Sequence, residues 1–178
     1  PKNKWELSDM MKFAIHHNGP IALRYPRGEA YDGLEEYRAP IALGKWEVLQ
    51  KGKKIALLAV GSMVRTAWKV CEELKEKGIS ATCINARFVK PLDYELLTEL
   101  SQDHSLLVTM EENVHNGGFG EQVTAWLKEQ KLEADILNIS IPDTFVEHGI
   151  VEQLHRKLGL DAENILQRIQ DWQEEQQE

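Results

Sequence analysis

"IALLAVGS", residues 55–62, is an unbroken apolar run that ends in a Gly-Ser turn. Such a run is typical of a central strand in a parallel sheet, because that strand is buried on both faces. An apolar stripe at helical spacing follows it: Val64, Ala67, Cys71 and Leu74. Ser62 is the predicted N-cap of this helix and Gly78 its predicted end. A buried strand followed directly by an amphipathic helix predicts an α/β fold.

Strands and helices continue to alternate around this unit. Besides 55–60, the patterns predict strands at 44–50, 79–86, 106–110 and 136–141. Helices are predicted after the strands at 79–86 and 106–110, and two more follow the last strand, at about 150–158 and from Asp161 onward. The alternation predicts a three-layer α/β/α fold with a mostly parallel sheet. The strand at 44–50 could pair with 54–60 through the Lys51–Lys53 turn, or it could lie at another edge.

The first 27 residues have a different organisation. Asn3 and Glu6 form a plausible capping box for a helix that runs to about His17, and a short strand is predicted at 21–24. One helix and one strand cannot bury their own apolar faces. We therefore predict that residues 1–27 are the end of a preceding domain, either loosely held or packed against another copy. Residues 28–43 have the character of a linker, and the acidic tail from Glu174 is predicted to fray.

Length, charge and cysteine content limit the classes of protein. The 178 residues carry a net charge of −8 without a large basic cluster, which argues against a nucleic-acid partner. No stretch suggests a membrane span or a signal peptide, so we expect a cytoplasmic protein. Cys71 and Cys83 fall at predicted core positions and are interpreted as buried thiols rather than a disulfide or metal site. Because the chain begins at Pro1 without a methionine, we expect a piece of a longer protein.

Two arginines flank a proline in the motif Arg24-Tyr25-Pro26-Arg27-Gly28. Pro26 restricts the backbone and Gly28 allows a sharp turn. Guanidinium groups are suited to bidentate binding of phosphate or carboxylate, so this loop is a candidate site for an anionic substrate. The alternative is that both arginines are solvated surface groups that pair with nearby acidic residues.

A second motif, residues 111–120, reads Glu-Glu-Asn-Val-His-Asn-Gly-Gly-Phe-Gly between a predicted strand and helix. Its glycines would let backbone amides approach an anion at the helix start. The spacing matches neither a dinucleotide fingerprint nor a phosphate-binding P-loop. The alternative is a structural turn with exposed carboxylates and a solvated His115.

Six segments, taken in order, resemble the C-terminal part of the 1-deoxy-D-xylulose-5-phosphate synthase family. They are "ALRYPRG" (22–28), "GSMVRTAWKV" (61–70), "ARFVKPLD" (86–93), "EENVHNGGFGEQV" (111–123), "NISIPDTFVEHG" (138–149) and "LGLDAENI" (158–165). The resemblance covers nearly the whole chain, and the common order of the six segments is more specific than any one of them.

The resemblance implies a domain organisation. Residues 1–27 resemble a helix–strand remnant of the pyrimidine-binding (middle) domain, 28–39 a linker, and 40–172 the transketolase-type C-terminal domain, with 173–178 left as a disordered acidic tail. The family's C-terminal domain has a five-stranded mixed sheet. Its antiparallel edge strand lies away from the strand that follows it, and we prefer this arrangement to the hairpin.

The resemblance also implies a function for a parent enzyme. That enzyme uses thiamine diphosphate and Mg²⁺ to condense pyruvate with D-glyceraldehyde 3-phosphate, for isoprenoid, thiamine and pyridoxal synthesis. It is a homodimer that includes the remainder of the chain. Arg27 matches the arginine that binds the substrate phosphate, and Arg24 and Tyr25 match supporting loop residues. No catalytic, cofactor-binding or metal-binding residue is expected here, so residues 1–178 alone are expected to be inactive.

Three alternatives remain open on the sequence. Transketolase and the β subunit of 2-oxo-acid dehydrogenases share this type of domain, although "RYPRG" favours the synthase. A freestanding, noncatalytic α/β interaction module would fit if residue 1 is a natural start. A nucleotide-binding protein is disfavoured by the glycine spacing.

Overall fold

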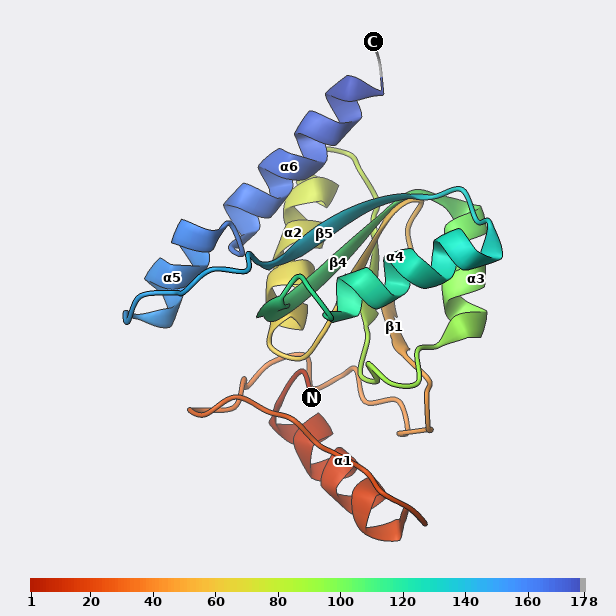
Figure 1. Ribbon diagram of the computed structural model, residues 1–178, viewed down its shortest axis with the longest axis vertical. Coiled ribbons are helices and arrows are strands. Elements are labelled where there is room, and N and C mark those ends of the chain that lie inside the picture. The colour runs from red at the N-terminus through yellow and green to blue at the C-terminus, as the bar shows by residue number, and fades with distance from the viewer. Residues whose placement is uncertain (177–178) are drawn as a thin grey trace.

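The computed structural model of the protein describes residues 1–176. Within this range a five-stranded sheet has helices on both faces (Figure 1). The elements follow one another as α1 (Lys4–His16), β1 (Glu47–Gln50), β2 (Lys54–Ala59), α2 (Met63–Glu76), β3 (Thr82–Asn85), α3 (Tyr94–Asp103), β4 (His104–Val114), α4 (Phe119–Gln130), β5 (Asp135–Ile141), α5 (Val151–Leu158) and α6 (Ala162–Glu175). The predicted three-layer α/β/α fold is confirmed. No helix of the described residues is long and apolar enough to cross a membrane.

The strand order is β1-β3-β2-β4-β5. β2 pairs in parallel with β3 and β4, and β4 pairs in parallel with β5. β1 pairs antiparallel with β3 at the sheet edge, so no hairpin joins β1 to β2. The turn between them crosses the start of β3, where the Gly52 amide donates to Thr82 Oγ1 at 2.8 Å and the Lys53 amide to Ser80 O at 2.7 Å. The edge position implied by the family resemblance is therefore confirmed.

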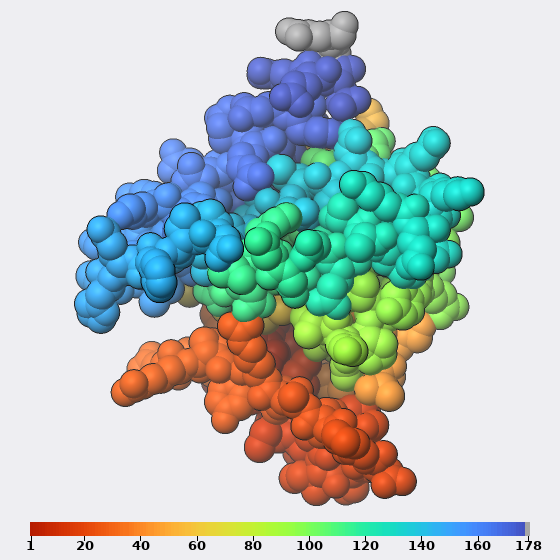
Figure 2. Space-filling model, viewed as in Figure 1, coloured from red at the N-terminus to blue at the C-terminus, as the bar shows by residue number. Residues whose placement is uncertain are grey.

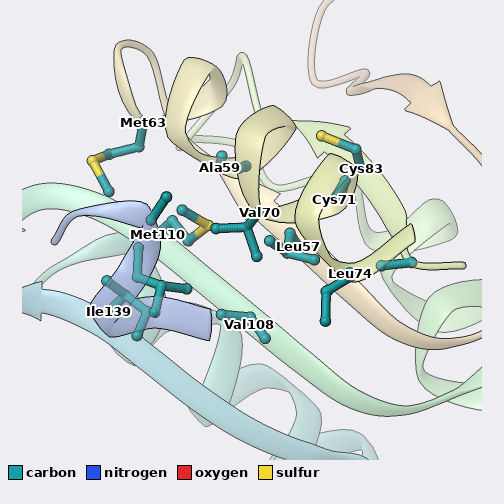
Figure 3. Packing of buried hydrophobic residues seen from close by; sticks show 14 of the residues in the cluster. Leu57, Ala59, Met63, Val70, Cys71, Leu74, Cys83, Val108, Met110 and Ile139 are labelled. Atoms are coloured by element: carbon teal, nitrogen blue, oxygen red, sulfur yellow. The ribbon is translucent and has the colours of Figure 1, made fainter. Parts of the chain in front are cut away.

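The sheet separates two apolar cores. One lies beneath α2 and α6 and includes the buried residues of β2, β4 and β5 shown in Figure 3. The other lies beneath α3 and α4, where Trp46 meets Phe119 with ring centroids 5.6 Å apart. Cys71 and Cys83 are free thiols in the first core, at the buried positions predicted for them. Contact with Cys71, together with burial, raises the pKa of the Cys83 thiol.

A buried ionic cluster joins α1 to the sheet, although α1 lies apart from the other helices in Figure 1. Lys2 Nζ lies 3.3 Å from Glu6 Oε1 and 2.7 Å from Glu47 Oε2. Arg87 contacts the same two carboxylates, at 3.0 Å and 2.6 Å. Asn85 Nδ2 donates to both, at 2.7 Å and 3.0 Å. We call Lys2, Glu6, Glu47, Asn85 and Arg87 the ionic cluster. We expected residues 1–27 to be loosely held, and the ionic cluster shows that this expectation is wrong for the start of α1.

Three local predictions need correction. Residues 21–24 are not a strand, because no neighbouring strand completes a ladder with them. Ser62 precedes α2 without a side-chain capping bond and donates instead to Glu112. α6 continues to Glu175, into the predicted tail, because Trp172 Nε1 and Gln176 Nε2 both donate to Asp135, at 2.9 Å and 3.3 Å. Residues 177 and 178 of that tail lie outside the described residues.

Candidate functional site

The arginine motif forms an exposed turn beyond the carboxyl edge of the sheet. Gly28 has φ of +130°, a conformation that strains any residue with a Cβ, so glycine is required for the chain to turn here. Tyr25 and Arg27 are both exposed. Among the described residues, Arg27 has no hydrogen bond or ion pair. Its guanidinium is therefore accessible to an anion in solvent. The alternative interpretation required an ion pair with a nearby acidic residue, and neither Glu29, Asp32 nor Glu35 forms one with Arg27.

Arg24 makes a different contact from Arg27. Its guanidinium donates to Asn113 Oδ1, a residue 89 positions away in the second motif. The structure thus brings the two candidate motifs together, which no spacing in the sequence indicates. Arg24 and Tyr25 are predicted to support the loop, and that role stays a prediction; the structure shows this one hydrogen bond for Arg24 and an exposed Tyr25.

A groove of about 710 Å³ separates the arginine motif and α1 from the carboxyl ends of β2, β3 and β4. In Figure 2 the N-terminal segment, red to orange, lies below the rest of the molecule along this boundary. The chain leaves β2 for β3 on one side, while β4 lies on the other, so the ends of β2 and β4 flank the topological switch point of the sheet. Ligands of open α/β sheets tend to bind at this place. Apolar side chains dominate the walls, with Arg24, Ser62, Glu112 and Asn113 as polar groups.

The glycine-rich loop of the second motif already holds an anion of its own. Glu111 is 1% exposed, and its two carboxylate oxygens accept from the Phe119 and Gly120 amides, each at 2.8 Å. These amides begin α4, so a side chain occupies the position where a phosphate would bind. A Cβ at Gly118 would lie 2.6 Å from Glu111 Oε1, which explains the glycine there by close approach to the carboxylate. The structural interpretation of this loop therefore fits better than the phosphate-binding one.

Glu112, the next residue, links three elements. Its carboxylate accepts from Ser62 after β2, and its Oε1 lies 2.8 Å from His155 Nε2 on α5. The contact with His155 holds the pKa of Glu112 below its ordinary value, in spite of burial. The same contact raises the pKa of His155, with burial opposing the rise. A carboxylate between a serine and a histidine is not a nucleophilic triad, because the histidine must lie next to the serine to remove its proton.

The groove brings charged and polar side chains together beside the carboxyl ends of the strands. Within residues 1–176, no three His, Cys, Asp or Glu side chains lie close enough together to share a metal ion. Arg27 is exposed, and the residues lining the groove include Arg24 and Tyr25 but not Arg27. Sequence reasoning singled out Arg24 and Arg27 by residue type and Tyr25 through the family resemblance, and the roles of all three stay predictions. It missed the pairing of Arg24 with Asn113 and of Glu112 with His155, because both pairs form only after folding.

Comparison with known proteins relates this chain to one family of domains. The family model for "Transketolase, C-terminal domain" matches residues 44–165. The 1-deoxy-D-xylulose-5-phosphate synthase of Lachnoclostridium phytofermentans is 51% identical over 170 residues, which is 95% of this chain. The enzyme of the same name from Synechococcus sp. (strain JA-2-3B'a(2-13)) is 44% identical over 172 residues. The chain spans 27% of the length of the first of these relatives and 26% of the second.

A solved structure agrees with the fold and with the N-terminal segment. A split-gene transketolase in an inactive β4 tetramer superposes with a TM-score of 0.88 at 27% identity, over 96% of this chain and 55% of the other. That coverage extends beyond residues 44–165 and so includes part of the N-terminal segment. The matched family model, the strand order and the relatives all lead to one conclusion: the chain belongs to the transketolase C-terminal domain family.

Proposed function

We propose that this chain acts as the C-terminal part of a thiamine-diphosphate-dependent synthase. The reaction would condense pyruvate with D-glyceraldehyde 3-phosphate to give 1-deoxy-D-xylulose 5-phosphate and CO2, in the cytoplasm. The observation that carries the proposal is 51% identity over 95% of the chain to a protein of that name. The transketolase relative, at 27% identity, supports the fold but favours this substrate pair less. Residues 1–27 would then belong to the middle domain, 28–39 to a linker and 40–172 to the C-terminal domain.

The contribution of this chain is binding of the acceptor's phosphate by Arg27. A phosphate dianion and a planar guanidinium can form two parallel charged hydrogen bonds. Arg27 is exposed at a turn fixed by Pro26 on one side and Gly28 on the other, which limits the positions of its side chain. Pyruvate carries no phosphate, so Arg27 would act on one substrate of the two.

The described residues do not themselves fit thiamine diphosphate with Mg²⁺. Mg²⁺ needs carboxylate or amide oxygens in octahedral geometry, and no cluster of acidic or histidine side chains within residues 1–176 offers such a site. We therefore place cofactor binding, and the homodimer contacts that complete the enzyme, in the remainder of the parent chain. Residues 1–178 alone would be inactive.

Replacing Arg27 in the complete enzyme tests the proposal. Arg27→Ala should raise the KM for glyceraldehyde 3-phosphate about ten- to a hundredfold, which corresponds to the roughly 1.5–3 kcal/mol of a charged hydrogen bond. The KM for pyruvate should stay unchanged. Arg27→Lys should recover part of the loss, because an ammonium keeps the charge without the planar fork.

Two controls make this result specific. Arg156→Ala removes another exposed arginine, on α5, and should leave both KM values unchanged. Unphosphorylated glyceraldehyde should be used equally well by the wild type and by Arg27→Ala. An equal loss with both aldehydes would show that Arg27 is structural and that the phosphate role is wrong.

A further inference from the structure

One side-chain hydrogen bond joins the arginine motif to the rest of the described structure. Residues 18–28 form no helix or strand. Among the described residues, the hydrogen bond from Arg24 to Asn113 Oδ1 is the one that residues 18–28 make with any other part of the chain. This stretch lies between α1, which the ionic cluster anchors at its start, and a linker without regular structure. The position of the motif therefore depends on Asn113.

Asn113 is itself held by a hydrogen bond to Glu111. Its Nδ2 donates to Glu111 Oε2 at 3.2 Å, so its Oδ1 is left to face Arg24. Glu111 is buried and bound by two amides at the start of α4, as described above. A series of hydrogen bonds thus runs from the first turn of α4 through Glu111 and Asn113 to Arg24. An acceptor that is buried at its base and oriented by a second bond is well suited to holding a loop in one place.

The backbone between the two arginines transmits this position. Pro26 lies directly before Arg27, and its ring fixes its own φ while restricting Tyr25 to extended conformations. Fixing Arg24 therefore fixes the direction from which Arg27 emerges, three residues further along. We propose that Asn113, through Arg24, is a positioning residue for the phosphate-binding Arg27. The inference rests on the function proposed above. It gives the second motif a role in positioning the arginine motif, in place of phosphate binding by its glycines.

Kinetics of the complete enzyme test the inference. Asn113→Ala should raise the KM for glyceraldehyde 3-phosphate about three- to tenfold, as expected for one lost hydrogen bond at the surface. The turnover number kcat and the KM for pyruvate should stay within twofold of the wild type. Arg24→Ala should give the same change, and the double variant should be no worse than either single variant, since both remove the same contact. Arg24→Lys keeps an N–H donor and should recover part of the loss.

Asn116→Ala is the matched control, because Asn116 is an exposed asparagine of the same loop with no hydrogen bond in the described structure. It should leave all constants unchanged. A second readout needs no activity. Limited cleavage of this chain by trypsin after Arg24 and Arg27 should be faster in Asn113→Ala than in Asn116→Ala, with equal hydrogen-exchange protection in β4 and α4 as proof of an intact fold.

The outcomes separate this inference from the proposed function. If Arg27→Ala raises the KM for the aldehyde phosphate but Asn113→Ala does not, the positioning role is wrong while the proposed function stands. Additive losses in the double variant, or equal losses in kcat and both KM values, would also overturn it, since they indicate unrelated or general damage. If Arg27→Ala has no effect on the KM for the aldehyde phosphate, the proposed function fails, and trypsin cleavage after Arg24 and Arg27 still decides whether Asn113 holds the motif.

Discussion

A buried group of charged side chains contributes to stability, and the sequence singled out only Glu6 among them, as part of a capping box. Lys2, Glu6, Glu47 and Arg87 are all nearly inaccessible, with side-chain exposures of 1–4%. Each is a common surface residue type, and although Lys2 and Glu6 are four residues apart, Glu47 and Arg87 lie far along the chain, so no local pattern predicts that all four meet. Burying charges costs several kcal/mol each unless partners and hydrogen bonds offset it. Here two positive and two negative groups balance in charge, and Asn85 and the Ala39 amide donate to the carboxylates, although Asn85 Oδ1 and Arg87 Nε are buried without a hydrogen-bond partner.

Removing one charge from this cluster should be costly. Glu47→Gln keeps the shape but leaves one buried positive charge without compensation. We expect the free energy of unfolding to fall by about 3–5 kcal/mol, measured by urea denaturation near neutral pH. Glu95→Gln is the control, because Glu95 pairs with Lys45 at the surface with its side chain 76% exposed. That surface pair should contribute about 1 kcal/mol or less. Equal effects of the two substitutions would contradict the account.

Acid should weaken the same cluster. Burial alone would raise the pKa of Glu47, but hydrogen bonds from Lys2, Asn85 and Arg87 outweigh it and the pKa is lowered. A carboxyl group with a lowered pKa stabilises the fold above its unfolded-state pKa, and that stabilisation is lost as pH falls through the folded-state value. The destabilisation by Glu47→Gln should therefore be large near pH 7 and shrink in acid.

At the scale of single elements, local signals were predictable and distant partners were not. Asn3 caps α1 as predicted, with its Oδ1 accepting from the Glu6 amide at 2.9 Å, because that contact spans three residues. Ser62 has an equally suitable residue type, yet its hydroxyl donates to Glu112, fifty positions away. The predicted strand at 21–24 failed for a related reason: a strand exists only with a neighbour, and the apolar pattern of Ile21-Ala22-Leu23 does not say whether one is present.

α5 is the helix whose contact with the sheet includes a titratable pair, His155 and Glu112. None of its residues is fully buried, and its approach includes the exposed Phe145 and Ile150. His155 joins it to Glu112 at the end of β4, with Asp161 as a further nearby negative charge. The pKa of His155 is raised, so the pair stabilises the docked helix fully below the unfolded-state pKa, and that contribution is lost as pH rises through the folded-state value.

Hydrogen exchange of α5 against pH measures this effect. After correction for intrinsic exchange rates, protection of residues 151–158 should fall as pH rises above about 6.5, the usual pKa of histidine. His155→Gln keeps an N–H donor that does not titrate, so the hydrogen-exchange protection of residues 151–158 in this variant should not change with pH over the same range. Protection in β2 should be independent of pH in both proteins. Parallel pH profiles of α5 in the wild type and His155→Gln would refute the dependence.

For the molecule as a whole, the class of fold followed from alternation, but the strand order did not. The runs at 55–60, 106–110 and 136–141 predicted parallel strands with crossover helices, and all three are confirmed. The position of β1 was undecided on residues alone, since the Lys51–Lys53 turn also suited a hairpin. The family resemblance supplied the edge position, which reflects packing of β1 against β3 that no short pattern encodes.

The isolated chain should not bind thiamine diphosphate. The described residues offer no cluster of ligands for Mg²⁺, and the glycine-rich loop already has its amides bound by Glu111. Calorimetric titration of the 178-residue chain with thiamine diphosphate and Mg²⁺ should therefore give no saturable heat in the micromolar range. The complete enzyme, titrated under the same conditions, is the positive control. Saturable micromolar binding by the isolated chain would disprove this prediction.

The carboxylate of Glu111 has a consequence for selectivity in the cell. Nucleotides and sugar phosphates abound there, and an open helix start lined with glycines would attract all of them without discrimination. In this protein the Glu111 carboxylate occupies the N-terminus of α4 and accepts from its first amides. Because Glu111 is part of the chain, free phosphates do not find an open binding site there. The same carboxylate accepts from Asn113, so one buried side chain both blocks phosphate binding at the start of α4 and, if the proposed roles are correct, helps to position the arginine motif.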